Sequence, residues 1–424
     1  MIIVGIIAGI VSGVVATFIT YFITKRRTSI DEVTKRVEKE ISDIKVYLDG
    51  LPRATTKDFF QKALAAKENY RWDEAIHFFR QGLINASTQE KVPILMQIGN
   101  CFYSTGDLDQ ALGHYQESLI LARSIKDKKG EILNLGNIGV IYQTKGDLQK
   151  AVEIFNKVLE ISKELENKES IANTLGNIGL IYQAQGDLDK ALKYHKEALK
   201  IGRELGNKKD EVRQLGNISL IYQLRGDLDK AFEYLNNVLT ISKEIGWEES
   251  VANALGNMGL IYKAKGDLDK SLKFLQDALD IDQKIANKEG VSIQLSNIGT
   301  IYQTRGDLDK ALRYFEDSLK LDTEMDRKDG IAMNLGHIGV IYKMKGNLNK
   351  ALEYYEKAIK IDRNIGVKEH EARMLTGFGD IFQSKGDKEK ALDYLNQALE
   401  IFKQIGAKRE IEMVENNIRA LKNK

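Results

Sequence analysis

The chain has 424 residues, of which 63 are lysine or arginine and 61 are aspartate or glutamate, so its formal net charge at pH 7 is +2. A balance this close to zero gives no electrostatic case for nucleic-acid binding. Cys101 is the single cysteine, which excludes an intramolecular disulfide and a cysteine-based metal cluster, and the presence of only 2 prolines suits a nearly all-helical chain.

Residues 1–24 predict a transmembrane helix that anchors the chain. No charge occurs between Ile2 and Ile23, and at 1.5 Å rise per residue this stretch spans roughly 33 Å, enough for a bilayer core. A secretory signal would place its positive charges before the apolar run, whereas Lys25-Arg26-Arg27 follows it. Because basic residues tend to stay on the cytoplasmic side, we expect a single-pass cell-membrane protein whose remaining residues face the cytoplasm.

Three glycines of the predicted anchor, Gly5, Gly9 and Gly13, are spaced four residues apart. Small residues at this spacing let two membrane helices pack closely, so they form a candidate face for a homodimer. Glycine is also common in membrane helices that have no partner. The spacing alone therefore leaves both interpretations open.

Residues 25–52 predict a juxtamembrane amphipathic helix and linker. Its apolar residues recur at intervals of eleven, as Ile30 and Ile41 do, and this interval fits a nearly straight helix better than a left-handed coiled coil. The helix is therefore as well suited to dock on the following structure as to pair with a second copy. Pro52 ends it.

A unit of 40 residues then recurs eight times across residues 92–411. A fixed period of this size is typical of a stacked array of two-helix units. In one copy Ile138 and Tyr142 share a face of the first helix, Gly146 breaks that helix, and Asp147 is placed to N-cap the second. The glycines at the same turn are Gly106, Gly146, Gly186, Gly226, Gly266, Gly306, Gly346 and Gly386.

The small, aromatic and turn positions of this unit resemble the tetratricopeptide repeat (TPR). In one copy they are Gly139, Tyr142, Gly146, Ala151 and Phe155. The resemblance implies an all-α fold, a TPR α-solenoid in which helix pairs wind into a right-handed superhelix. The units lack the family's closing proline and exceed its usual length of about 34 residues, and in this they are similar to the repeats of the LGN and kinesin light chain adaptors.

The two ends of the array depart from the repeat. Residues 56–91 predict a degenerate first TPR, in which Tyr70 replaces the turn glycine. Residues 409–424 continue the pattern of a first helix and then stop. Polar residues in this last segment suit a C-terminal capping helix that exposes one face to solvent.

One polar position on the first helices is the main candidate for a binding site. It is occupied by Asn137, Asn177, Asn217, Asn257 and Asn297 in five successive repeats, before His337 and Gly377 end the run. A carboxamide both donates and accepts hydrogen bonds, so it can pair with a peptide backbone of any sequence. The flanking positions of the same face are Asn173, Arg213 and Asn253 one turn earlier, and Leu180, Leu220 and Leu260 three residues later.

In TPR arrays this position faces the concave groove, where we expect the leucines to form the floor. The row of asparagines, called the asparagine ladder below, is similar to the one in the repeats of O-GlcNAc transferase, although nothing here resembles the catalytic domain of that enzyme. The alternative is that the asparagines bond to neighbouring helices and only join the repeats.

The sequence offers no catalytic constellation. Its histidines are scattered through the repeats, and the aspartates that follow the turn glycines in most repeats are explained as helix caps. We therefore expect a protein that is not an enzyme, without cofactor or metal: a membrane-anchored scaffold or adaptor that binds an extended peptide or a partner protein in the concave groove. The alternative is a signalling regulator whose array changes curvature when a small peptide binds. Such regulators carry an N-terminal helical output domain, for which only one helix is available here.

Overall fold

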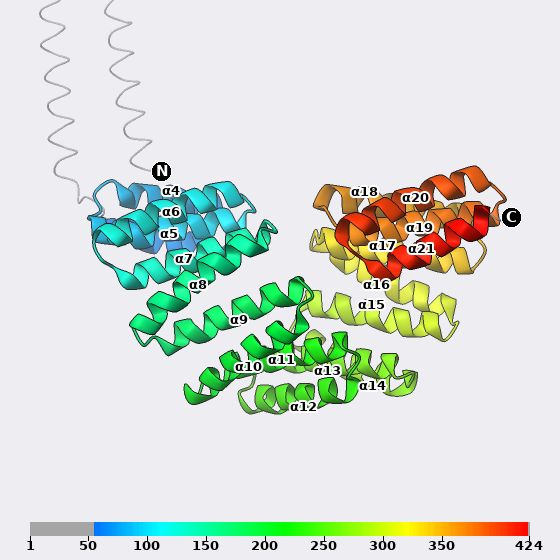
Figure 1. Ribbon diagram of the computed structural model, residues 1–424, viewed down its shortest axis with the longest axis horizontal. Coiled ribbons are helices and arrows are strands. Elements are labelled where there is room, and N and C mark those ends of the chain that lie inside the picture. The colour runs from blue at the N-terminus through cyan, green and yellow to red at the C-terminus, as the bar shows by residue number, and fades with distance from the viewer. Residues whose placement is uncertain (1–54, 423–424) are drawn as a thin grey trace, which may run out of the picture. The chain divides into compact units, whose positions relative to one another are not determined.

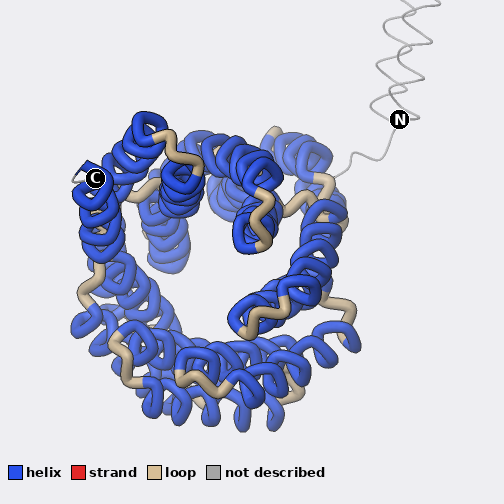
Figure 2. The backbone as a smooth tube through the Cα atoms, turned by 90° about the vertical axis from the view of Figure 1, so that its right-hand side faces the viewer, coloured by secondary structure: helices blue, strands red, loops and turns tan. Residues whose placement is uncertain are grey.

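The computed structural model describes residues 55–422, and within this range all regular structure is helical (Figures 1 and 2). The predicted all-α fold is thereby confirmed for this part of the chain. No helix within residues 55–422 is long and apolar enough to cross a membrane. The predicted anchor at 1–24, with Gly5, Gly9 and Gly13, and the predicted juxtamembrane helix at 25–52 lie outside the described residues.

The chain forms two compact units, the first ending at Asn137 and the second beginning at Ile138. The helices up to this boundary are α3 (Thr56–Glu68), α4 (Trp72–Leu83), α5 (Thr88–Ser104), α6 (Leu108–Ser124) and α7 (Lys128–Thr144), which contains it. In the second unit the first helices of successive repeats are α9 (Lys168–Ala184), α11 (Lys208–Leu224), α13 (Glu248–Ala264), α15 (Lys288–Thr304), α17 (Lys328–Met344) and α19 (Lys368–Ser384). The second helices are α8 (Leu148–Glu164), α10 (Leu188–Glu204), α12 (Leu228–Glu244), α14 (Leu268–Lys284), α16 (Leu308–Glu324), α18 (Leu348–Ile365) and α20 (Lys388–Ile405), and α21 (Lys408–Lys422) follows the last.

The turn inside each repeat forms as its residues predict. Gly146 has φ +79°, a left-handed conformation that glycine adopts without a steric cost. The side chain of Asp147 accepts a hydrogen bond from the backbone N–H of Lys150 at 3.2 Å, which confirms it as the N-cap of α8. In the degenerate first repeat Tyr70 takes the left-handed position itself, with φ +56°.

Small residues let the two helices of a repeat approach closely. A Cβ placed on Gly139 would lie 2.8 Å from the ring of Phe155, and Ala151 on the second helix is fully buried. Where a serine replaces this glycine, at Ser219, its hydroxyl donates to the backbone carbonyl of Ala231 at 2.8 Å. The departure from the repeat pattern is therefore accommodated by a buried hydrogen bond.

In five of the repeats the turn glycine is followed by two aspartates, which have different roles. Asp187 caps α10, whereas Asp189 forms an ion pair with Arg225 of the next repeat at 2.5 Å. Asp229 and Lys265 make the same contact one repeat later, at 2.6 Å. Exposed pairs of this kind contribute about 0–1 kcal/mol each, so they help to align neighbouring repeats but do not dominate the stability.

Candidate functional site

The first helices line the inner side of the curved second unit. Each helix packs on its neighbours in sequence, and in addition first helices of successive repeats contact each other: α9 with α11, α13 with α15, α15 with α17, and α17 with α19. Successive second helices do not make contacts of this extent. Because elements on the inner side of a curved array lie closer together, the first helices form the concave face.

The ladder asparagines of the second unit are accessible on these first helices. Asn177, Asn217 and Asn297 are half-buried and Asn257 is exposed. Within the described part of the chain, none of their carboxamides is engaged by a hydrogen bond to another residue. Asn137 is the last residue of the first unit and is likewise half-buried. The carboxamides are thus free to pair with something other than the repeats.

The positions around the ladder differ in their exposure. Asn173, Arg213 and Asn253 are all exposed, and Arg213 forms an ion pair with Asp210 of its own helix. The predicted floor is uneven, because Leu180 and Leu260 are half-buried whereas Leu220 is 42 % exposed. The site therefore combines unpaired carboxamides with aliphatic surface.

A position that the sequence analysis did not single out, three residues before the ladder, makes buried polar contacts between repeats. Gln214 is buried and its Oε1 lies 2.8 Å from Nδ1 of His195 in the preceding helix. Asn334 is buried and donates to Asp322 Oδ2 at 2.8 Å. The same position holds an alanine in another repeat, at Ala254. Polar residues at a position that can also be apolar are the sequence signal from which these contacts between repeats could have been predicted.

Three second helices carry a buried aspartate at the same position, 40 residues apart. Asp282, Asp322 and Asp362 are each no more than 1 % exposed. Burial raises the pKa of Asp282 and of Asp322, because the charged form is poorly solvated there. Asp362 lies 2.7 Å from Nδ1 of His370 in the next repeat.

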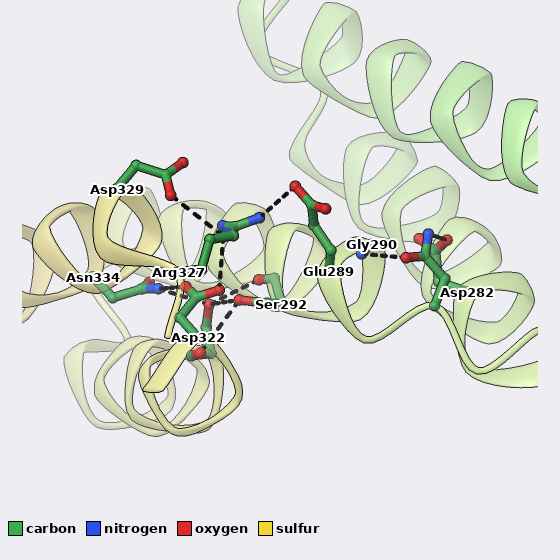
Figure 3. A network of polar contacts seen from close by, with 10 residues as sticks. Asp282, Glu289, Gly290, Ser292, Asp322, Arg327, Asp329 and Asn334 are labelled. Atoms are coloured by element: carbon green, nitrogen blue, oxygen red, sulfur yellow. Dashed lines mark hydrogen bonds and ion pairs between the residues drawn. The ribbon is translucent and has the colours of Figure 1, made fainter. Parts of the chain in front are cut away.

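Figure 3 shows how Asp322 is held. Arg327 Nε lies 3.0 Å from Asp322 Oδ1, and Arg327 also pairs with Glu289 of the preceding repeat at 3.1 Å. Asn334 donates to the other carboxylate oxygen. The buried charge is thus compensated by groups from both sides of the interface.

Each buried aspartate faces the residue eight positions later, at the start of the next first helix. Gly290 stands opposite Asp282 and Gly330 opposite Asp322, and a Cβ on either glycine would overlap the carboxylate. Other interfaces use serine on both sides, joined at 2.8 Å: Ser162 with Ser170, and Ser242 with Ser250. The two sides of an interface are therefore matched in size and polarity.

A pocket of about 630 Å³ lies between α17 and α19 on the concave side. His337 and Gly377, which occupy the ladder position in these repeats, both line it. Met333 and Met374 supply apolar lining, and burial lowers the pKa of His337 to about 4, so this imidazole is neutral at pH 7. Beyond the last asparagine of the ladder, the residues at the ladder position therefore line the pocket between α17 and α19.

The repeated helix pairs and their open concave face define a protein of the TPR class. The family model for the MalT-like TPR region matches residues 74–249 and 219–415, which is well over half of the sequence, so the chain belongs to this family. No curated protein sequence matches the chain.

Solved structures share the fold at low sequence identity. The apo form of the quorum sensor NprR from B. thuringiensis is 15 % identical, with 82 % of this chain and 98 % of that chain covered and a TM-score of 0.58. The Rap conjugation gene regulator of the plasmid pLS20, in complex with the Phr* peptide, is 14 % identical, with 82 % and 98 % covered and a TM-score of 0.54. A signal transduction ATPase with a TPR sensor from Pyrococcus horikoshii is 16 % identical, with 85 % and 55 % covered and a TM-score of 0.55.

Proposed function

We propose that this protein is a membrane-anchored adaptor that binds an extended peptide, or an extended segment of a partner protein, along the concave face of its first helices. The observation that carries the proposal is the row of carboxamides at Asn177, Asn217, Asn257 and Asn297, which make no hydrogen bonds within residues 55–422. A peptide backbone offers donors and acceptors that match them. The Rap regulator of the same fold that was solved with the Phr* peptide supports a ligand of this kind.

The pocket between α17 and α19 would take an apolar side chain of that peptide. Its lining residues His337 and Gly377 continue the ladder position, so a peptide lying on the ladder runs onto it. Met333 is 50 % exposed, and Ile293, at the equivalent position of the preceding first helix, is 40 % exposed. Burying such aliphatic surface adds affinity that is not tied to the peptide backbone.

The ladder is tested by replacing Asn177, Asn217 and Asn257 with alanine in the full chain kept in detergent. The probe is a fluorescein-labelled pool of random octapeptides, and binding is followed by fluorescence anisotropy. At about 0.5–1.5 kcal/mol per hydrogen bond, the triple substitution should weaken binding by roughly 10- to 2000-fold if the three effects are additive. The melting temperature should hardly move, because these carboxamides hold nothing in the fold.

A matched control replaces three exposed asparagines of second helices, Asn156, Asn236 and Asn396, with alanine. The control variant also replaces three asparagines with alanine, and it should bind the peptide pool as tightly as the wild type does. Early unfolding of the ladder variant together with undiminished peptide binding would show that the asparagines join the repeats instead.

A second function, that of a peptide-responsive regulator, is favoured by the relatives named as a quorum sensor and as a conjugation gene regulator. In that case binding should change the curvature of the array. Small-angle scattering with and without bound peptide separates the two functions, because an adaptor should keep its radius of gyration and a regulator should not.

The location is part of the proposal. The anchor at 1–24 would hold the repeats at the cytoplasmic side of the cell membrane, on the basis of the uncharged start and the basic residues that follow it. Gly5, Gly9 and Gly13 would provide the face through which two anchors pair.

A further inference from the structure

Two first helices of the second unit carry a lysine at the same position, one residue before the helix ends. Lys263 on α13 and Lys343 on α17 are 80 residues apart, and each reaches across to the next first helix. Lys343 forms an ion pair with Asp380 of α19 at 2.9 Å. Lys263 instead donates to the hydroxyl of Thr300 on α15 at 2.7 Å. Thr300 occupies the position that corresponds to Asp380, so Lys263 lacks the carboxylate that its counterpart has.

The ammonium group of Lys263 is therefore an uncompensated charge in a partly buried place. The side chain is half-buried, and within the described residues it forms no ion pair. Burial lowers the pKa of Lys263, because the charged form is poorly solvated there. Its charge also helps to lower the pKa of His337, after burial, which is the main cause. Removing an ammonium group from water without an anionic partner is unfavourable, so an incoming anion would be stabilised here.

The surroundings connect this charge to the ladder. The Thr300 hydroxyl donates to the backbone carbonyl of Asn297 at 2.8 Å, so its remaining lone pairs face Lys263. Asn257 lies less than two turns before Lys263 on the same helix. A peptide that lies on Asn257 and Asn297 would thus run close to the helix turns that hold the ammonium group and Thr300.

We propose that Lys263 binds a carboxylate of the peptide that lies along the ladder, in the place that Asp380 takes beside Lys343. This inference rests on the proposed function and adds a chemical requirement to it: the ligand is acidic at one position. One isolated ammonium group suits a single carboxylate, whereas a phosphate group is usually held by several cationic groups. The carboxylate comes either from an Asp or Glu side chain or from the C-terminus of the peptide.

The chain itself supplies conservative variants. Lys263→Gln introduces the residue found at this position in other repeats, which is Gln183, Gln223 and Gln303. Thr300→Asp copies the ion pair of Lys343 with Asp380, so the introduced carboxylate should pair with Lys263 inside the protein and leave it unavailable to a ligand. Lys265→Gln is the charge-matched control, because Lys265 caps the same helix but pairs with Asp229 at 2.6 Å.

Three fluorescein-labelled octapeptide pools provide the probes. The first has one central glutamate and an amidated C-terminus, the second has no acidic side chain and a free C-terminus, and the third has no acidic side chain and an amidated C-terminus. The wild-type full chain should bind the first or the second pool about 10-fold more tightly than the third. Tighter binding of the first pool would identify a side-chain carboxylate as the ligand group, and tighter binding of the second pool would identify the C-terminus.

Lys263→Gln and Thr300→Asp should both abolish this preference, and Lys265→Gln should keep it. Equal affinity of the wild type for all three pools, or a preference that survives in both variants, would overturn the role of Lys263 while leaving peptide binding intact. Failure of the wild type to bind any of the pools would overturn both proposals.

Discussion

Replacing Gly290 with serine should disrupt the interface between α14 and α15, and replacing Asp282 with serine in the same chain should restore it. Gly290 has no room for a Cβ, because the Asp282 carboxylate and the Asn287 side chain occupy that space. Overpacking of this kind costs about 1–3 kcal/mol, and the better helix propensity of serine returns about 0.5 kcal/mol. The single Gly290→Ser change should therefore destabilise this interface by roughly 0.5–2.5 kcal/mol.

The single Asp282→Ser change removes the acceptor that Asn287 reaches at 2.8 Å. It also removes a buried carboxylate whose raised pKa shows that its charged form is poorly solvated, so we expect a net cost of only about 1 kcal/mol. In the double variant two serines face each other, as Ser242 and Ser250 do at 2.8 Å. The double variant should then be about 1–2 kcal/mol more stable than the sum of the two single effects predicts.

Native-state hydrogen exchange of the four chains measures this coupling. Because each repeat contacts only its neighbours, the loss of protection in Gly290→Ser should be concentrated in α14 and α15. Gly113→Ser is the control, since a Cβ at this helical glycine meets nothing within 4 Å. If the double variant lost as much protection as the two single variants together, the matched-interface reasoning would be refuted.

Two further predictions concern pH and topology. The pKa of Asp282 is raised by burial, so the folded chain binds this proton more tightly than the unfolded chain does. As the pH falls through the folded pKa toward the unfolded value of about 3.9, the wild type should therefore gain stability relative to the Asp282→Asn variant. Hydrogen exchange in α14 measures this difference, and parallel pH profiles of the two chains would contradict it. If the repeats are cytoplasmic, protease added to intact cells should leave a C-terminal tag uncut until the cells are lysed, whereas cleavage before lysis would reverse the proposed orientation.

The features that repeat identically were predictable from the sequence. The 40-residue period gave the helix pairs, and Gly146 and Asp147 marked the turn and the cap because each does so through its own backbone or side chain. The turn between repeats was harder to predict. It is also left-handed, but non-glycine residues such as Glu166 (φ +51°) and Ala286 (φ +55°) take that position in several repeats.

The contacts that vary from repeat to repeat were not predicted. The match of Asp282 with Gly290 depends on two residues from different repeats, and neither departs far enough from the pattern to attract notice alone. The same holds for Lys263, whose significance emerges only beside Lys343 and Asp380. Periodicity identifies what the repeats share, whereas these pairs are what distinguishes one repeat from the next.

The path of a bound peptide is the most direct test of the account. The random octapeptide pool, with a benzophenone photo-crosslinker at its centre, is irradiated with the full chain, and the adducts are located by mass spectrometry. Binding along the concave face predicts adducts on the first helices α9, α11, α13, α15, α17 and α19. Adducts concentrated on the second helices α10, α12, α14 and α16 would contradict it and place the binding surface on the outer face.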